Sequence, residues 1–328
     1  MLIAEGDATS EAIGLAYQRA RGIPDSQVIR LSVPRSGGAA MTAAEFQTMK
    51  DSLDARLPAQ VQATLVTWSQ PSRVVGTCSM GLTSALAFGY DSGYCGTSCR
   101  ATTATAYFNN ATRQPWTDLR IRPSMMLGAA TLAEAQTLIA RGVAADNSWS
   151  ANSASPATGQ AVLIRTNDVA RSVRYNDFRS MVPSPVARLT TNYIDNFGGA
   201  AGNNFVANQN NLMFYFTGLP TVPQINSNSF LPGAVADHLT SLGGMTEPGA
   251  SANTGGQMPI TAWLQAGATA SYGTVEEPCN YSDKFPQASL MIRRYASGET
   301  LIEAYWKSVR SPGQGLFIGE PLARPWGP

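Results

Sequence analysis

The chain contains a single histidine, and it stands next to a carboxylate. Asp237-His238 follows the apolar run at residues 234–236, which has the composition of a strand. A carboxylate beside an imidazole can fix the ring tautomer for general-base work. His238 is therefore a candidate general base that Asp237 orients. The alternative is a partly buried histidine satisfied by backbone groups, and the sequence leaves both interpretations open.

Cys279 is the candidate nucleophile. It follows Glu276, Glu277 and Pro278 in a loop that comes directly after a predicted strand at residues 267–272. A nucleophilic cysteine needs a lowered thiol pKa, which a neighbouring cation or a helix N-terminus supplies. Two adjacent glutamates have the opposite effect. Cys279 is thus either the nucleophile of an acyl transfer with His238 as base, or half of a disulfide.

The four cysteines, at positions 78, 95, 99 and 279, allow three full pairings. Cys95 and Cys99 share one Gly/Ser/Tyr-rich loop, so we expect a local Cys95–Cys99 disulfide, with Cys78–Cys279 as the second pair. Their spacing matches structural zinc sites poorly. Two disulfides imply an oxidising compartment. With only 14% charged residues, the chain is predicted to be exported, to the periplasm, the cell surface or the medium.

Carboxylates at predicted strand ends offer a different chemistry, because oxygen-rich clusters suit calcium or magnesium. A solvated polar rim is the alternative interpretation of the same residues. The candidate ligands are Asp237, Glu276, Glu277 and Glu320 with His238, and Asp7 and Asp91 could join them. No other cofactor is expected, since the glycine pairs lack the strand–loop–helix context of a phosphate cradle.

The elements that would position these residues alternate between strand and helix. Helices are predicted at residues 10–21, 42–56 and 131–141, and the second and third open with capping boxes, Thr42 with Glu45 and Thr131 with Glu134. Strands are predicted at residues 2–4, 28–33, 63–68, 161–165 and 212–216. After Cys279, two amphipathic helices precede a short strand that ends at Glu320. This alternation predicts an α/β fold with a mostly parallel sheet and helices on both faces.

Ligands of such sheets bind at the carboxyl ends of the strands. The residues predicted to line a substrate site at this rim are Thr217, Gly218, Ser241, Glu276, Glu277 and Glu320. Residues 78–116 are rich in Gly, Ser, Thr and Tyr and are expected to form an insertion over the rim. We expect one α/β domain over residues 1–328.

Composition excludes two classes of partner. The net charge of +1 gives no basic excess for nucleic acid. No stretch approaches 18 apolar residues, so no membrane span is predicted. Nor does a leader begin at Met1, because a strand is expected almost at once; whether a leader was removed, and the oligomeric state, stay open.

Residues 211–328 resemble the caspase-like fold of gingipain-type peptidases and their CHAT relatives. The matching pieces are FYFTG at 214–218, residues 234–244, AWLQAGAT at 262–269, GETLIEA at 298–304 and GEP at 319–321. The histidine of those families falls at about Thr217 and their cysteine at about Ser241, so the usual dyad is absent. A surviving dyad would be His238 with Cys279, displaced by one strand.

Nearly the whole chain resembles an uncharacterised bacterial family found in species that carry exosortase, the enzyme that sorts PEP-CTERM-tagged exported proteins. The motifs are AYQRARGIP, RPSMML, FYFTGL, FLPGAVADHLTS, GATASYGTVEEPCN and GETLIEAYWKSV with PGQGLFIGEPLA. The resemblance implies export and supplies no mechanism.

Three functions follow as hypotheses. The first is an exported, peptidase-like protein that acts on or binds polypeptide at the rim of the sheet. The second is a non-catalytic, degenerate caspase-like module for binding or assembly at the cell surface, whose partner is a polypeptide or a cell-surface protein. The third is a calcium- or magnesium-dependent hydrolase that uses the carboxylate cluster.

Overall fold

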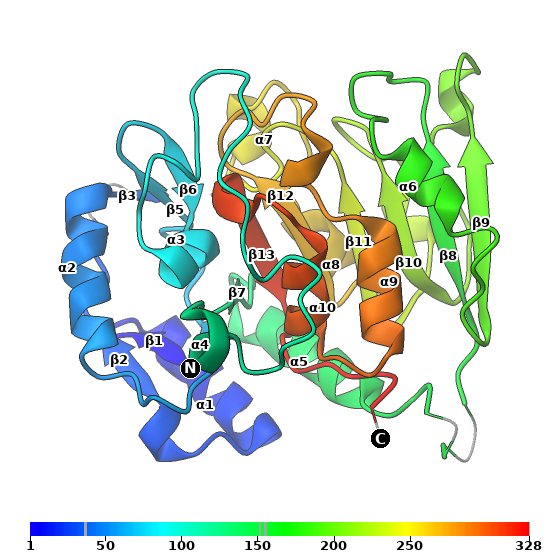
Figure 1. Ribbon diagram of the computed structural model, residues 1–328. Helices are drawn as coiled ribbons and strands as arrows, with labels where there is room; N and C mark the ends of the chain where they lie inside the picture. The colour runs from blue at the N-terminus through cyan, green and yellow to red at the C-terminus, as the bar shows by residue number, and fades with distance from the viewer. Residues whose placement is uncertain (36–37, 151, 154–155, 328) are drawn as a thin grey trace.

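The computed structural model describes residues 1–35, 38–150, 152–153 and 156–327. Ten strands of this part form one twisted sheet that crosses the whole molecule (Figure 1). Their spatial order is β2 (Ile29–Leu31), β1 (Leu2–Ala4), β4 (Thr64–Val66), β7 (Ser124–Met126), β13 (Gly315–Gly319), β12 (Ala270–Thr274), β11 (Phe230–His238), β10 (Leu212–Thr217), β8 (Gly159–Arg165) and β9 (Leu189–Asp195).

The sheet consists of two parallel halves that run in opposite directions. Strands β2, β1, β4, β7 and β13 are parallel to their neighbours, and so are β12, β11, β10, β8 and β9. The halves meet where β12 pairs antiparallel with β13. The sequence did not predict this reversal, which puts the carboxyl ends of β12 and β13 at opposite edges.

Helices cover both faces of the sheet (Figure 1). Those on the face turned toward the viewer are α3 (Leu82–Phe88), α4 (Pro115–Leu119), α6 (Tyr175–Ser180), α9 (Ala288–Ala296) and α10 (Leu301–Ser308). The opposite face carries α5 (Leu132–Ala145) and α8 (Thr261–Ala266), and α1 (Ala8–Arg21) packs on α5. The predicted α/β class, mostly parallel with helices on both faces, is confirmed.

Local sequence explains where the helices begin. Both predicted capping boxes are present, at α2 (Ala43–Asp54) and at α5. Helix α5 nevertheless continues past Gly142, where the sequence predicted its end. A Cβ at Gly142 would lie 2.3 Å from an oxygen of Glu320. Glycine inside this helix therefore leaves room for a buried carboxylate instead of stopping the helix.

The cysteines pair differently from the prediction. The disulfides are Cys78–Cys95 and Cys99–Cys279, so the expected pairs Cys95–Cys99 and Cys78–Cys279 are wrong. The reason is that Cys95 is buried in the same hydrophobic cluster as Cys78. That cluster also holds residues of the small sheet of β3 (Ala40–Thr42), β5 (Arg73–Val75) and β6 (Ser79–Gly81). Cys99 is left to join the loop after β12. The segment at residues 78–116 is thereby tied to that loop, and it contributes β6 and α3 to the fold.

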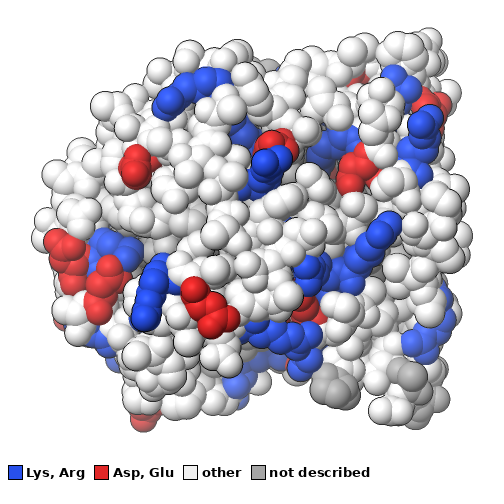
Figure 2. All heavy atoms as spheres, viewed as in Figure 1, with Lys and Arg blue, Asp and Glu red and all other residues white. Residues whose placement is uncertain are grey.

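The face of the molecule shown in Figure 2 carries little charge. Basic and acidic side chains on this face are interspersed among broad uncharged areas. Across the described residues, no helix has the length and apolar character needed to cross a bilayer.

Candidate functional site

His238 lies at the carboxyl end of β11, as predicted, but both of its ring nitrogens are occupied. Its Nε2 lies 3.0 Å from the carbonyl oxygen of Met258, and its Nδ1 accepts a hydrogen bond of 3.0 Å from the indole N–H of Trp263. This pattern fixes a neutral imidazole with the proton on Nε2. Complete burial lowers its pKa to about 3. His238 is therefore a structural histidine, and the general-base hypothesis is wrong.

Asp237 cannot orient His238, because successive side chains of a strand point to opposite faces of the sheet. Asp237 instead accepts a hydrogen bond of 2.7 Å from Arg174, which also donates to the carbonyl of Thr217. Both partners of this ion pair are buried, with side chains 2% and 1% exposed. Burial raises the pKa of Asp237, and Arg174 opposes that effect.

Cys279 is covalently committed through its disulfide with Cys99. A cystine sulfur carries no thiolate and cannot act as the nucleophile of an acyl transfer. The proposed dyad of His238 and Cys279 is therefore wrong. The other interpretation of Cys279, as half of a disulfide, is the one that the structure bears out.

The predicted rim residues Thr217, Gly218 and Ser241 take part in contacts of the backbone with neighbouring loops. Thr217 is buried, and its carbonyl accepts from Arg174. The carbonyl of Gly218 accepts from Thr166, and a Cβ at Gly218 would lie 1.9 Å from the carbonyl oxygen of Arg171. The carbonyl of Ser241 accepts from Thr274 at 2.7 Å. These contacts close the strand ends against their loops.

The structure separates the predicted cation ligands. Glu276 accepts from the backbone N–H of Ser79, and Glu277 accepts from that of Cys279. Glu320 lies at the opposite edge, fully buried, where it accepts hydrogen bonds from Tyr17 and Arg21. Two further candidates are also engaged elsewhere: Asp7 caps α1 and Asp91 accepts from Gly93. Within the described ranges no group of three His, Cys, Asp or Glu residues is placed to hold a metal ion, so the structure does not bring the predicted ligands together.

Lys284 is a rim residue that the sequence analysis missed. Its amine lies 5.1 Å from the centre of the Tyr281 ring and has no hydrogen-bond partner among the described residues. Burial lowers its pKa to about 8, and nearby Arg100 contributes in the same direction. The residue is 1% exposed, so no substrate reaches the amine.

An open region lies elsewhere, along β9 at the edge of the sheet. Backbone hydrogen bonds to β8 come from even-numbered residues: the carbonyl of Arg188 accepts from Gly159, and Asn196 donates to Arg165. In a parallel ladder the intervening residues direct their N–H and C=O groups away from that neighbour. Thr191 and Tyr193 therefore present backbone donors and acceptors outward. No described strand pairs with this side.

A hollow of about 620 Å³ accompanies the β9 edge. Apolar side chains from the segments that precede and follow β9 in the chain contribute to it, among them Val182 and Val206. Val182 is 55% exposed. The sequence did not predict β9, because Thr190-Thr-Asn-Tyr193 lacks the continuous apolar character expected of a parallel strand.

Comparison with known proteins adds little. No protein-family model matches the chain, and no curated protein sequence is significantly similar to it. A solved structure described as "Structure of Protease" superposes with a TM-score of 0.44 and 11% sequence identity, over 99% of this chain and 78% of that chain. At that score the likeness assigns no residue and no activity. The caspase-like relation and the exosortase-associated family stay predictions.

Proposed function

We propose that this chain is an exported, non-catalytic module that binds an extended polypeptide along the edge of β9. The single observation that carries the proposal is the seven-residue edge strand with outward backbone groups at Thr191 and Tyr193. An extended peptide can pair with such an edge as one more strand, and its main-chain hydrogen bonds supply the affinity.

Strand β9 lacks several of the features that keep other edge strands from pairing. Natural sheets protect long edges with Pro, Lys, bulges or covering loops. Strand β9 contains no Pro or Lys, and its register with β8 runs without a shift from Leu189 to Asp195. Its one charged residue, Asp195, is paired with Arg165. The edge is thus long, regular and nearly uncharged.

The hollow beside β9 supports a side-chain preference. Because successive residues of a bound strand alternate between two faces, every second peptide side chain would meet the apolar groups of the hollow. Val182, Ile194 and Val206 suit small branched apolar side chains. We expect the preferred peptides to alternate such residues with polar ones.

Export belongs to the same proposal. Disulfides persist in oxidising compartments, and this chain holds two of them. The resemblance to an exosortase-associated family points in the same direction. The partner would then be a polypeptide of the cell surface or the periplasm. Neither peptide hydrolysis nor cation-dependent hydrolysis is proposed, since the groups that each requires are committed to other contacts.

A proline substitution tests the proposal. Thr191→Pro removes an outward N–H donor without touching the ladder to β8, and edge strands tolerate proline at such positions. The probe is a fluorescent seven-residue peptide that alternates Val with Ser or Asn. We expect Thr191→Pro to weaken binding at least tenfold. The matched control, Thr191→Val, keeps the backbone donor and should bind like the parent chain.

Two results would overturn the proposal. One is equal binding by the parent and Thr191→Pro, which would mean that the peptide does not pair with β9. The other is retained binding of the same peptide after N-methylation of alternate residues, because those methyl groups remove the donors of the added strand. Absence of binding by the parent across a set of such peptides would equally contradict it.

A further inference from the structure

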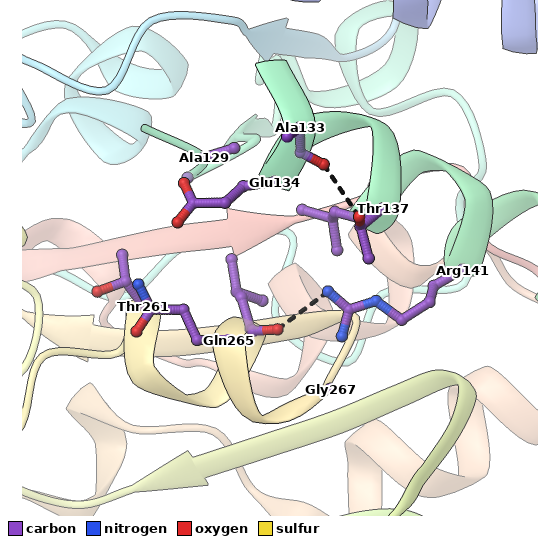
Figure 3. A pocket seen from close by; sticks show the side chains of 11 residues that line it. Ala129, Ala133, Glu134, Thr137, Arg141, Thr261, Gln265 and Gly267 are labelled. Atoms are coloured by element: carbon purple, nitrogen blue, oxygen red, sulfur yellow. Dashed lines mark hydrogen bonds between the residues drawn. The ribbon is translucent and has the colours of Figure 1, made fainter. Parts of the chain in front are cut away.

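A second hollow, of about 510 Å³, lies between α5 and α8 (Figure 3). Gly128 and Ala129, which follow the carboxyl end of β7, form part of its wall. The loops at the carboxyl ends of parallel strands are where α/β sheets bind ligands. Its size is that of a small-molecule site.

The hollow has one cationic group. Arg141 extends from the last turns of α5 toward α8, where its Nη2 donates a hydrogen bond of 2.9 Å to the carbonyl of Leu264 (Figure 3). Its Nε is buried and has no hydrogen-bond partner within the part of the chain that the structure describes. The guanidinium therefore retains donors that protein groups do not use.

Arg141 also lacks a counter-ion. None of its described neighbours forms an ion pair with it, in contrast to Arg21, which contacts both Glu320 and Asp146. Burial lowers the pKa of Arg141, and no carboxylate counteracts that effect. Arg141 is half-buried, so water screens its charge only in part and an anion with matching geometry would be attracted to it. A planar guanidinium fits a carboxylate in two parallel hydrogen bonds.

The far end of the hollow sets the shape of that anion. Glu134 is seven residues before Arg141 on α5, which corresponds to about 10 Å along the helix axis. Its carboxylate accepts hydrogen bonds from the backbone N–H groups of Ala130 and Thr131. Between the two ends, α5 contributes Thr137 and Leu138 to the lining and α8 contributes Leu264. Ala129 and Ala133 line the hollow at the Glu134 end (Figure 3). A second negative group on the ligand would meet Glu134.

We propose that the hollow between α5 and α8 binds a monocarboxylate with an apolar body, whose carboxylate pairs with Arg141. The body lies along the hollow and ends short of Glu134. This site is separate from the β9 edge and does not depend on the proposed polypeptide binding.

Octanoate, octanamide and octanedioate are the probes, and calorimetric titration of the full chain is the measurement. Octanoate should bind, octanamide at least tenfold more weakly because it has no charge for Arg141, and octanedioate more weakly because it carries a second charge. Arg141→Met should weaken octanoate at least tenfold. Arg19 is an exposed residue of α1, and Arg19→Met removes the same charge and should leave octanoate binding unchanged.

Arg141→Met also removes the bond to Leu264, so a second variant keeps the test decisive if that one unfolds. Thr137→Phe fills the hollow between Glu134 and Arg141 and leaves Arg141 in place; it should abolish octanoate binding in a folded protein. Equal affinity for octanoate and octanamide, undiminished binding by Thr137→Phe, or no octanoate binding by the parent would each overturn the proposal. Thr191→Pro should not alter octanoate binding, which separates this site from β9.

Discussion

The rim of the sheet at β10, β11 and β12 and the open edge at β9 use polar groups in opposite ways. At the rim, the imidazole of His238 is bonded on both nitrogens, Asp237 is paired with Arg174, and the sulfur of Cys279 is in a disulfide. Along β9, in contrast, the side chains offer no obvious catalytic group, and no strand among the described residues pairs with the outward backbone groups of Thr191 and Tyr193. At the rim, residue types that are common in catalytic sites instead stabilise the fold.

The difference shows why a candidate site must be judged by what its groups already contact. A buried polar group must be satisfied or the fold loses stability. Once His238 and Cys279 have found partners within the chain, they have nothing left to offer a ligand. Asp237 is bound through Oδ1 to Arg174, and its Oδ2 is buried without a partner among the described residues. Free binding capacity remains where such satisfaction is incomplete, as at the β9 edge and at Arg141.

The largest effect should come from the rim disulfide. Cys99→Ser releases Cys279 from a loop with 180 residues between its ends, against 17 for Cys78–Cys95. Chain-entropy estimates give a loss of about 5 kcal/mol for the longer loop and about 3 kcal/mol for the shorter. Urea unfolding of Cys99→Ser and of Cys78→Ser/Cys95→Ser measures both.

The same variant tests the rim as a catalytic site. Cys99→Ser frees the thiol of Cys279, so a peptidase held inactive by its disulfide would gain activity. We expect no cleavage of a fluorogenic peptide set by Cys99→Ser, since His238 has no free nitrogen. Cleavage that Cys279→Ala abolishes would restore the rim as an active site and contradict the comparison.

The next largest effect should come from the buried ion pair. Asp237→Asn leaves the guanidinium of Arg174 buried without its counter-ion, which costs about 3 to 5 kcal/mol. The matched substitution at the edge, Asp195→Asn, breaks a pair whose carboxylate side is 43% exposed, and should cost under about 1 kcal/mol. Chemical unfolding of the two variants compares them directly. Similar losses would show that burial does not distinguish the regions.

His238 should make stability depend on pH. The pKa of its ring is about 3 in the folded chain against an ordinary value of 6.5, so between these values the unfolded chain binds a proton that the folded chain does not. Stability contributed by the neutral ring is therefore lost as the pH falls from about 6.5 toward 3, at up to about 1.4 kcal/mol per pH unit. His238→Gln should flatten this slope in urea unfolding. An unchanged slope would place the titration elsewhere.

The smallest effect on stability should come from the outward face of β9. Thr191→Pro removes no ladder bond and should change the unfolding free energy by under about 1 kcal/mol. Thr190→Pro removes an N–H that points to β8 and should cost about 3 kcal/mol or more. Thermal and urea unfolding distinguish the two. Equal costs would mean that the alternation of inward and outward groups is assigned wrongly.

The fold was accessible from the sequence wherever the signal was local. Capping boxes at Thr42 and Thr131 and the apolar run of β10 predicted elements that the structure contains. Gly142 led to a wrong prediction of the end of α5, because its role depends on Glu320, which is distant in the chain. The antiparallel placement of β13 and the cysteine pairing depend on contacts between segments that the spacing of residues does not encode.

The site was less accessible for a related reason. Asp237-His238 is an adjacent pair in sequence, yet in a strand adjacent side chains face away from each other. The open edge at β9 depends on what is absent beside it, and Arg141 stands out only because no carboxylate lies near it. Neither property has a sequence motif.

The most direct test of the central claim is residue-resolved amide hydrogen exchange along β9, measured by NMR with and without the alternating Val peptide. Free protein should show fast exchange at Thr191 and Tyr193 and slow exchange at Thr190 and Asn192. Peptide at saturation should slow the amide exchange of Thr191 and Tyr193 at least tenfold and leave that of Thr190 and Asn192 unchanged. Unaltered exchange at Thr191 and Tyr193 with peptide bound would contradict polypeptide binding at this edge.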